Sequence, residues 1–163
     1  MRAQVRGNHY GDVLRGGLAA LATIAALTGG WALVLPGSLY RDFPGLGMHW
    51  VAAAPPYSEN LVTDFGAALL GIAAGLGVAA VLGQRRVVQV VLLAALVQAV
   101  PHLIFHLSHP DLLPAGQEVA SRLALAVPVG LTLGLLWLSR HHNAKPTVAA
   151  ETMGPSSTAG SSR

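Results

Sequence analysis

The hydrophobic positions of this chain fall into four long blocks that short polar stretches separate. The blocks cover residues 18–35, 61–82, 87–107 and 119–138. A helix needs about 20 apolar residues to cross a hydrocarbon core of about 30 Å, and each block approaches or exceeds that length. Backbone groups inside lipid must be satisfied within their own segment. The pattern therefore predicts an all-α fold, a bundle of four transmembrane helices.

Charged residues are scarce and lie mostly at the ends of the blocks. Eight of the ten basic residues fall on one side of the predicted spans: Arg2, Arg6, Arg15, Arg85, Arg86, Arg140, Lys145 and Arg163. Only Arg41 and Arg122 fall on the other side, so the positive-inside rule places both termini in the cytoplasm. We divide the chain into a cytoplasmic N-terminal segment (residues 1–17), a membrane domain (18–140) and a disordered cytoplasmic tail (141–163).

The first block has an alternative interpretation as a cleaved signal peptide, because basic residues precede it. Its apolar run is longer than the usual 7–15 residues, and no small-residue cleavage site follows it. Trp31 and Pro36-Gly37 instead fit an interfacial anchor and a helix stop. We therefore expect this span to be retained.

Composition excludes several classes of function. Only 10% of the residues are charged, against about 25% in soluble domains, and no cysteine is present. Disulfides, thiolate metal sites and iron–sulfur clusters are excluded, and the basic residues follow topology rather than a nucleic-acid surface. The chain has no glycine-rich phosphate loop, nucleophile elbow or HExxH motif, so we assign no catalytic residue and no nucleic-acid partner.

Small residues recur at four-residue spacing in three of the blocks, a pattern that lets helices approach closely in lipid. The rows are Ala22, Ala26 and Gly30; Ala67, Gly71 and Gly75; and Gly130 with Gly134. We interpret them as packing positions within the bundle, with a homodimer as the alternative. The longest connection, residues 36–60, mixes aromatic residues with prolines, which predicts a segment folded at the membrane interface.

Three histidines lie along one side of the third block. His102, His106 and His109 share an arc of roughly 80° with Gln98. Ionisable side chains at membrane depth are costly and usually face protein, which makes them a functional-site hypothesis. Three interpretations stay open: a structural polar network, a metal site, and a proton-relay or small-molecule site.

The metal interpretation needs ligands beyond the histidine pair. His102 and His106 have the i, i+4 spacing of metal sites on helices. The second block runs antiparallel to the third, so Asp64 is expected at a depth similar to that of His106. We predict a site for a divalent transition metal made of His102, His106 and Asp64, with His109 and Glu59 as possible further ligands. Arg122 could neutralise Asp64 or pair with Glu118, four residues before it.

Two stretches, PYSENLVTDFGAALL (residues 56–70) and AVPHLIFHLSH (residues 99–109), resemble uncharacterised four-span membrane proteins of high-GC bacteria. Overall length and helix layout also resemble the broader DoxX-like group. The resemblance implies a multi-pass protein of the bacterial cytoplasmic membrane. Some DoxX-like proteins are accessory subunits of redox or quinone complexes, but the resemblance transfers no catalytic residue.

These observations lead to two hypotheses of function. The first is a small integral membrane protein whose outward-facing histidine and carboxylate site binds a metal ion or a small polar ligand. The alternative is a non-catalytic accessory subunit that packs against a larger membrane complex. The expected partners are the lipid bilayer and either such a complex or further copies of the chain.

Overall fold

The computed structural model describes residues 2–109 and 112–141, so most of the predicted tail lies outside the described residues. Its four long helices are α1 (Arg2–Val34), α3 (Glu59–Leu82), α4 (Arg85–Ser108) and α5 (Ala115–His141). Each is long and apolar enough to cross a membrane. The predicted all-α membrane fold with four spans is confirmed, and each helix extends a few residues or more beyond its apolar block.

Local sequence signals explain where these helices begin and end. Ser58 caps α3, because its hydroxyl accepts a hydrogen bond from the backbone N–H of Leu61 at 3.4 Å. The helix ends at Gly83, whose φ of +62° favours glycine and whose N–H bonds to the carbonyl of Ala79. Helix α4 begins two residues later, which makes α3 and α4 a tight antiparallel hairpin.

The long connection between α1 and α3 is folded, as expected. It contains helix α2 (Pro36–Asp42) and an antiparallel pair of two-residue strands, β1 (Pro44–Gly45) and β2 (Met48–His49). Three buried residues attach it to the ends of α1 and α3: Ala32, Leu39 and Val62, with Trp31, Phe43, Val51 and Phe65 packed around them. This small second core therefore joins the connection to α1 and α3.

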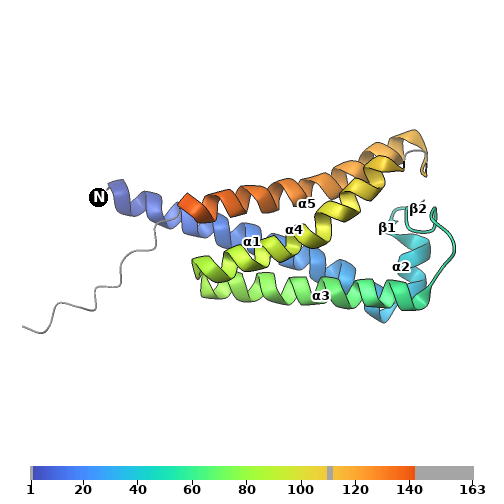
Figure 1. The fold of residues 1–163 in the computed structure, drawn as a ribbon, viewed down its shortest axis with the longest axis horizontal. Helices are drawn as coiled ribbons and strands as arrows, with labels where there is room; N and C mark the ends of the chain where they lie inside the picture. The colour runs from blue at the N-terminus through green and yellow to red at the C-terminus, as the bar shows by residue number, and fades with distance from the viewer. Residues whose placement is uncertain (1, 110–111, 142–163) are drawn as a thin grey trace, which may run out of the picture.

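The long helices form two pairs, α1 with α3 and α4 with α5 (Figure 1). The pairs meet around a main core at the end of the molecule that carries the Gly83 turn. That core contains Leu14, Leu18, Leu21, Leu76, Ala79, Val88, Leu92, Leu135 and Leu136. Toward the opposite end, α4 rises away from α3 (Figure 1). The bundle is therefore closed at one end and splayed at the other.

The closest helix contact joins α1 and α3 at Gly29 and Gly66. A Cβ atom added to Gly66 would lie 2.8 Å from the carbonyl oxygen of Gly29, from the backbone nitrogen of Leu33 and from the Cβ of Ala32. A Cβ added to Gly29 would meet the carbonyl oxygen of Gly66 at 2.8 Å. Only glycine fits at these two positions.

Some of the small residues predicted as packing positions lie in helix contacts, such as Ala22 against the main core, but four of the five predicted glycines do not. A Cβ added to Gly30, Gly71, Gly130 or Gly134 would meet nothing within 4 Å. Of the predicted glycines, only Gly75 faces a neighbour, the side chain of Val91 at 3.3 Å. Where α1 and α3 cross, Gly29 and Gly66 face each other. Gly30, the next residue along α1, does not face α3.

Candidate functional site

The three histidines of α4 lie beyond its buried residues, on the continuation of the face that packs against the bundle. Val88, Leu92 and Ala95 are the buried residues of that helix. At about 100° per residue, His102 and His106 point within roughly 40° of the direction of Val88. The two histidines therefore continue the packed face of α4 outward, beyond the last buried residue.

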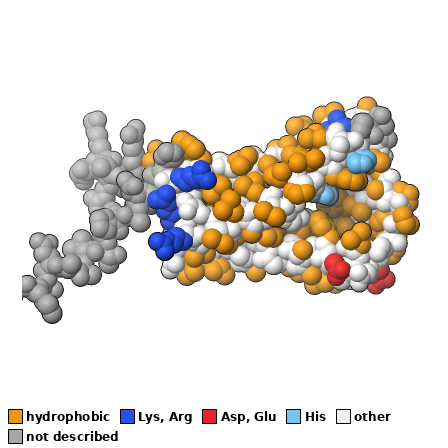
Figure 2. All heavy atoms as spheres, viewed as in Figure 1, with side chains coloured by type: hydrophobic (Ala, Val, Ile, Leu, Met, Phe, Trp, Pro, Cys, Tyr) orange, Lys and Arg blue, Asp and Glu red, His pale blue; other side chains and the backbone are white. Residues whose placement is uncertain are grey.

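A crevice opens between α3 and α4 at the level of these histidines. Gly75 of α3 still faces Val91 of α4 closely, but Ala68, seven residues further out on the same side of α3, is exposed. Leu61, another two turns out, is 69% exposed. Figure 2 shows the surface hollowed at this end of the molecule, with a histidine side chain at the edge of the hollow.

Two imidazoles lie side by side in this crevice. The ring centroids of His102 and His106 are 5.0 Å apart, and the ring of Phe65 on α3 lies 6.1 Å from that of His102. Neither imidazole makes a hydrogen bond to any of the residues that the structure describes. The pair is therefore available to a ligand.

The third predicted histidine is occupied by its own helix. The ring of His109 stacks on Phe105 with centroids 4.3 Å apart, and its Nδ1 lies 3.0 Å from the carbonyl oxygen of Phe105. His109 is the C-cap residue of α4. Its contacts are those of a helix end rather than of a ligand-binding group.

A carboxylate that sequence reasoning did not assign to the site lies on α5. Glu118 is only 9% exposed and forms an ion pair with Arg122, whose Nη2 is 2.9 Å from Oε1. This settles the partner of Arg122, which the sequence left open between Asp64 and Glu118. Both residues of the pair interact electrostatically with His106. The i, i+4 spacing of Glu118 and Arg122 was the signal for the pair.

The ion pair is incompletely satisfied. The second carboxylate oxygen of Glu118, Oε2, and the Nε of Arg122 are both buried without a hydrogen-bond partner among the described residues. Buried polar atoms usually have partners, so unpaired ones mark a site worth attention. Both atoms belong to α5, the helix that pairs with α4.

The structure does not bring Asp64 to the imidazoles. Asp64 is exposed and accepts a hydrogen bond from the side-chain amide of Asn60 at 3.0 Å. Around α3 it lies about 100° from Phe65, the residue that contacts His102, and about 40° from Ala68. Glu59 is also exposed, in the first turn of the same helix.

No group of three or more His, Asp or Glu side chains is arranged to hold a metal ion within residues 2–109 and 112–141. The metal site of His102, His106 and Asp64 therefore stays a prediction, because the three side chains are not arranged around one point. The structure brings together only the two histidines of that set.

A double-substitution cycle checks the separation of Asp64 from the histidines. Since Asp64 and His106 share no contact in the structure, the effects of Asp64→Ala and His106→Ala on unfolding free energy should add within about 0.5 kcal/mol. The measurement is reversible unfolding of the single and double variants in detergent. A coupling well above that value would mean that the carboxylate reaches the imidazoles.

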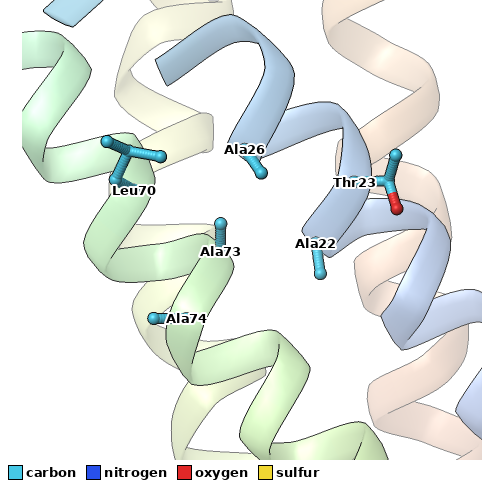
Figure 3. Close-up of a pocket in the computed structure, with 6 residues that line it drawn as sticks. All are labelled: Ala22, Thr23, Ala26, Leu70, Ala73 and Ala74. Atoms are coloured by element: carbon cyan, nitrogen blue, oxygen red, sulfur yellow. The ribbon is translucent and has the colours of Figure 1, made fainter. Parts of the chain in front are cut away.

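A second concavity lies on the outer surface of the α1–α3 pair. It has a volume of about 400 Å³ and is lined by small side chains from both helices, shown in Figure 3: Ala22, Thr23, Ala26, Leu70, Ala73 and Ala74. Its single hydroxyl, on Thr23, bonds to the carbonyl of Ala19 at 2.9 Å. This groove contains no ionisable group and therefore offers packing rather than chemistry.

No family model, curated protein or solved structure matches the chain. The function is therefore argued from the crevice and its side chains.

Proposed function

We propose that this protein is a membrane-embedded binding protein whose crevice between α3 and α4 holds a small ligand through His102 and His106. The observation that carries the proposal is the position of the imidazole pair. The rings lie side by side where the packed face of α4 continues into an open crevice, without hydrogen bonds to the described residues. His102 is exposed and His106 half-buried, so both rings can be reached by a ligand.

The chemistry of the pair favours a hydrogen-bonded polar ligand over a metal ion. A neutral imidazole offers one donor and one acceptor nitrogen. Two histidines supply half of the usual zinc coordination, and no further carboxylate is in place among the described residues. A metal would require Asp64 or Glu118 to move, whereas a polar ligand can use the pair as it stands.

Analysis of the purified protein tests this proposal. We expect the wild type, extracted in a mild detergent, to carry a bound small molecule or metal near one equivalent, seen by native mass spectrometry and elemental analysis. The double variant His102→Ala/His106→Ala should lose it, and His9→Ala, an exposed histidine on α1, should retain it. An identical bound content in wild type and double variant would refute a histidine-dependent site.

A second candidate function is that of a non-catalytic accessory subunit. The observation in its favour is the groove of small residues on the α1–α3 surface, which could accept a helix of a larger complex (Figure 3). We expect Ala26→Trp with Ala74→Trp to fill that groove and release the protein from any larger assembly on native gels. Unchanged migration would remove this candidate.

We also propose that both termini lie in the cytoplasm of a bacterial cell. Support comes from charge: Lys and Arg side chains gather at the closed end of the bundle, and Asp and Glu side chains appear at the splayed end (Figure 2). The positive-inside rule orients the closed end inward. The crevice then opens toward the outer side of the membrane.

Reporter fusions test this orientation. Fusions after Arg86 and after Lys145 should both report the cytoplasm, and a fusion within residues 40–55 should report the outside. The expected result follows from the eight basic residues on one side of the spans. An outside signal at either of the first two positions would reverse the orientation and place the crevice inside.

A further inference from the structure

We infer that the ligand of this crevice is an uncharged amphiphile of the surrounding leaflet, whose polar head meets His102 and His106 while its chain occupies the crevice. The inference rests on the proposed function and adds the class of ligand and its route of entry. Its evidence comes from three features of the crevice: its mouth, its apolar wall and its charge balance.

The mouth of the crevice faces the bilayer. Both of its sides, α3 and α4, are long apolar helices of the kind that cross a membrane, and they diverge toward their outer ends (Figure 1). A gap between two such spans is open sideways to lipid as well as outward to water. A molecule dissolved in the leaflet can therefore enter without first passing through water.

One wall of the crevice carries an apolar strip, and Asp64 borders that strip about 40° from Ala68 around α3. Leu61, Phe65 and Ala68 follow one another on α3 at spacings of four and three residues, which puts them on one face of the helix. That face continues inward to Gly75, where α4 closes on α3. From His102 to the last buried residue of α4, Ala95, the crevice is about 10 Å deep. A free polar solute would leave this wall uncovered, whereas an alkyl chain would cover it.

Two charged groups on α5, the helix paired with α4, neutralise each other. They are Glu118 and Arg122, which form an ion pair at 2.9 Å. An anionic headgroup would meet no free counter-charge among the described residues of this crevice and would lie near the Asp64 carboxylate, which is unfavourable. A hydroxyl or carbonyl head can exchange hydrogen bonds with the two imidazoles at no such cost. These groups therefore disfavour an anionic head, and the imidazole pair matches an uncharged, hydrogen-bonding one.

Three probe molecules, each added to the purified full-length protein, distinguish binding of the polar head from binding of the alkyl chain. These are 1-oleoylglycerol, which has an uncharged head and a chain, oleate, which has the chain with a charged head, and glycerol, which has no chain. We expect 1-oleoylglycerol to raise the midpoint of thermal unfolding by several degrees, because a ligand that binds only the folded state stabilises it. Oleate should raise it clearly less, and glycerol not at all.

Two neighbouring alanines of α3 provide a matched pair of variants. Ala68→Trp places a large ring in the crevice, whereas Ala67→Trp places the same ring on a side of α3 turned about 100° away. Both alanines are exposed, so both variants are expected to fold. The shift caused by 1-oleoylglycerol should disappear in Ala68→Trp and in His102→Ala/His106→Ala, and persist in Ala67→Trp.

The outcomes separate this inference from the function on which it rests. Equal shifts with oleate and 1-oleoylglycerol, a shift with glycerol alone, or a shift that survives Ala68→Trp would overturn the amphiphile. If native mass spectrometry then finds a water-soluble molecule or a metal that depends on the histidines, the binding function stands and only the ligand class fails. If the bound content does not depend on the histidines, the binding function itself fails.

Discussion

Gly66→Leu is expected to separate α1 from α3 and to lower the unfolding free energy by about 3 kcal/mol or more. The Cβ alone would lie 2.8 Å from backbone atoms of Gly29 and Leu33, and backbone cannot give way as a flexible side chain can. Overpacking a well-packed interface typically costs about 1–3 kcal/mol, and a whole leucine at a backbone contact belongs at the upper end.

Gly71→Leu is the matched control for this prediction. Gly71 lies on the same helix, is exposed, and would meet no atom within 4 Å with a Cβ. The substitution there removes only the unfavourable helix propensity of glycine, so stability should stay the same or rise by up to about 1 kcal/mol. Unfolding in detergent with increasing denaturant measures both variants. Similar losses in the two would show that α1 and α3 do not approach each other at Gly66.

Arg122→Met is expected to produce the second large effect. Its partner Glu118 is 9% exposed and already has one buried oxygen without a hydrogen bond. Removing the guanidinium leaves a buried carboxylate with no counter-charge, and breaking one side of a buried pair costs on the order of 3 kcal/mol. Arg140→Met, at the exposed C-terminal end of the same helix, should cost less than about 0.5 kcal/mol.

The double variant Glu118→Met/Arg122→Met distinguishes the charge effect from a loss of packing. Replacing both members of a buried ion pair by apolar residues is often close to neutral. We therefore expect the double variant to recover most of the stability that Arg122→Met loses, in the same unfolding measurement. A double variant less stable than the single one would mean that the two side chains contribute mainly through packing.

The hydrophobic pattern was sufficient to predict the four spans, because crossing a bilayer demands long apolar helices whatever their neighbours are. The stop of the first span was also readable: α1 ends at Val34, just before the predicted stop at Pro36-Gly37. The helix interface was not readable. In a sequence rich in alanine and glycine, small residues occur on every side of a helix. Only the way α1 crosses α3 decides that Gly29 and Gly66 are the ones in contact.

The candidate site was predicted in part for a similar reason. Helical spacing put His102 and His106 on one face, and the structure brings their rings together. Antiparallel pairing gave the depth of Asp64 but not its direction around α3, and the side chain turns to Asn60 instead. Helix α4 leaves α3 where the contacts between the two helix pairs end. The position of that end cannot be read from the sequence of either helix alone.

Disulfide trapping tests most directly the central claim that the bundle is closed at one end and open between α3 and α4 at the other. The chain has no cysteine, so any disulfide that forms must join the two introduced cysteines. Gly75→Cys with Val91→Cys lies at the closed contact, where a Cβ at Gly75 is 3.3 Å from the side chain of Val91. We predict that mild oxidation in membranes links this inner pair, while the outer pair Leu61→Cys with His106→Cys stays reduced. Equal linkage of the two pairs would contradict the open crevice and, with it, the binding site.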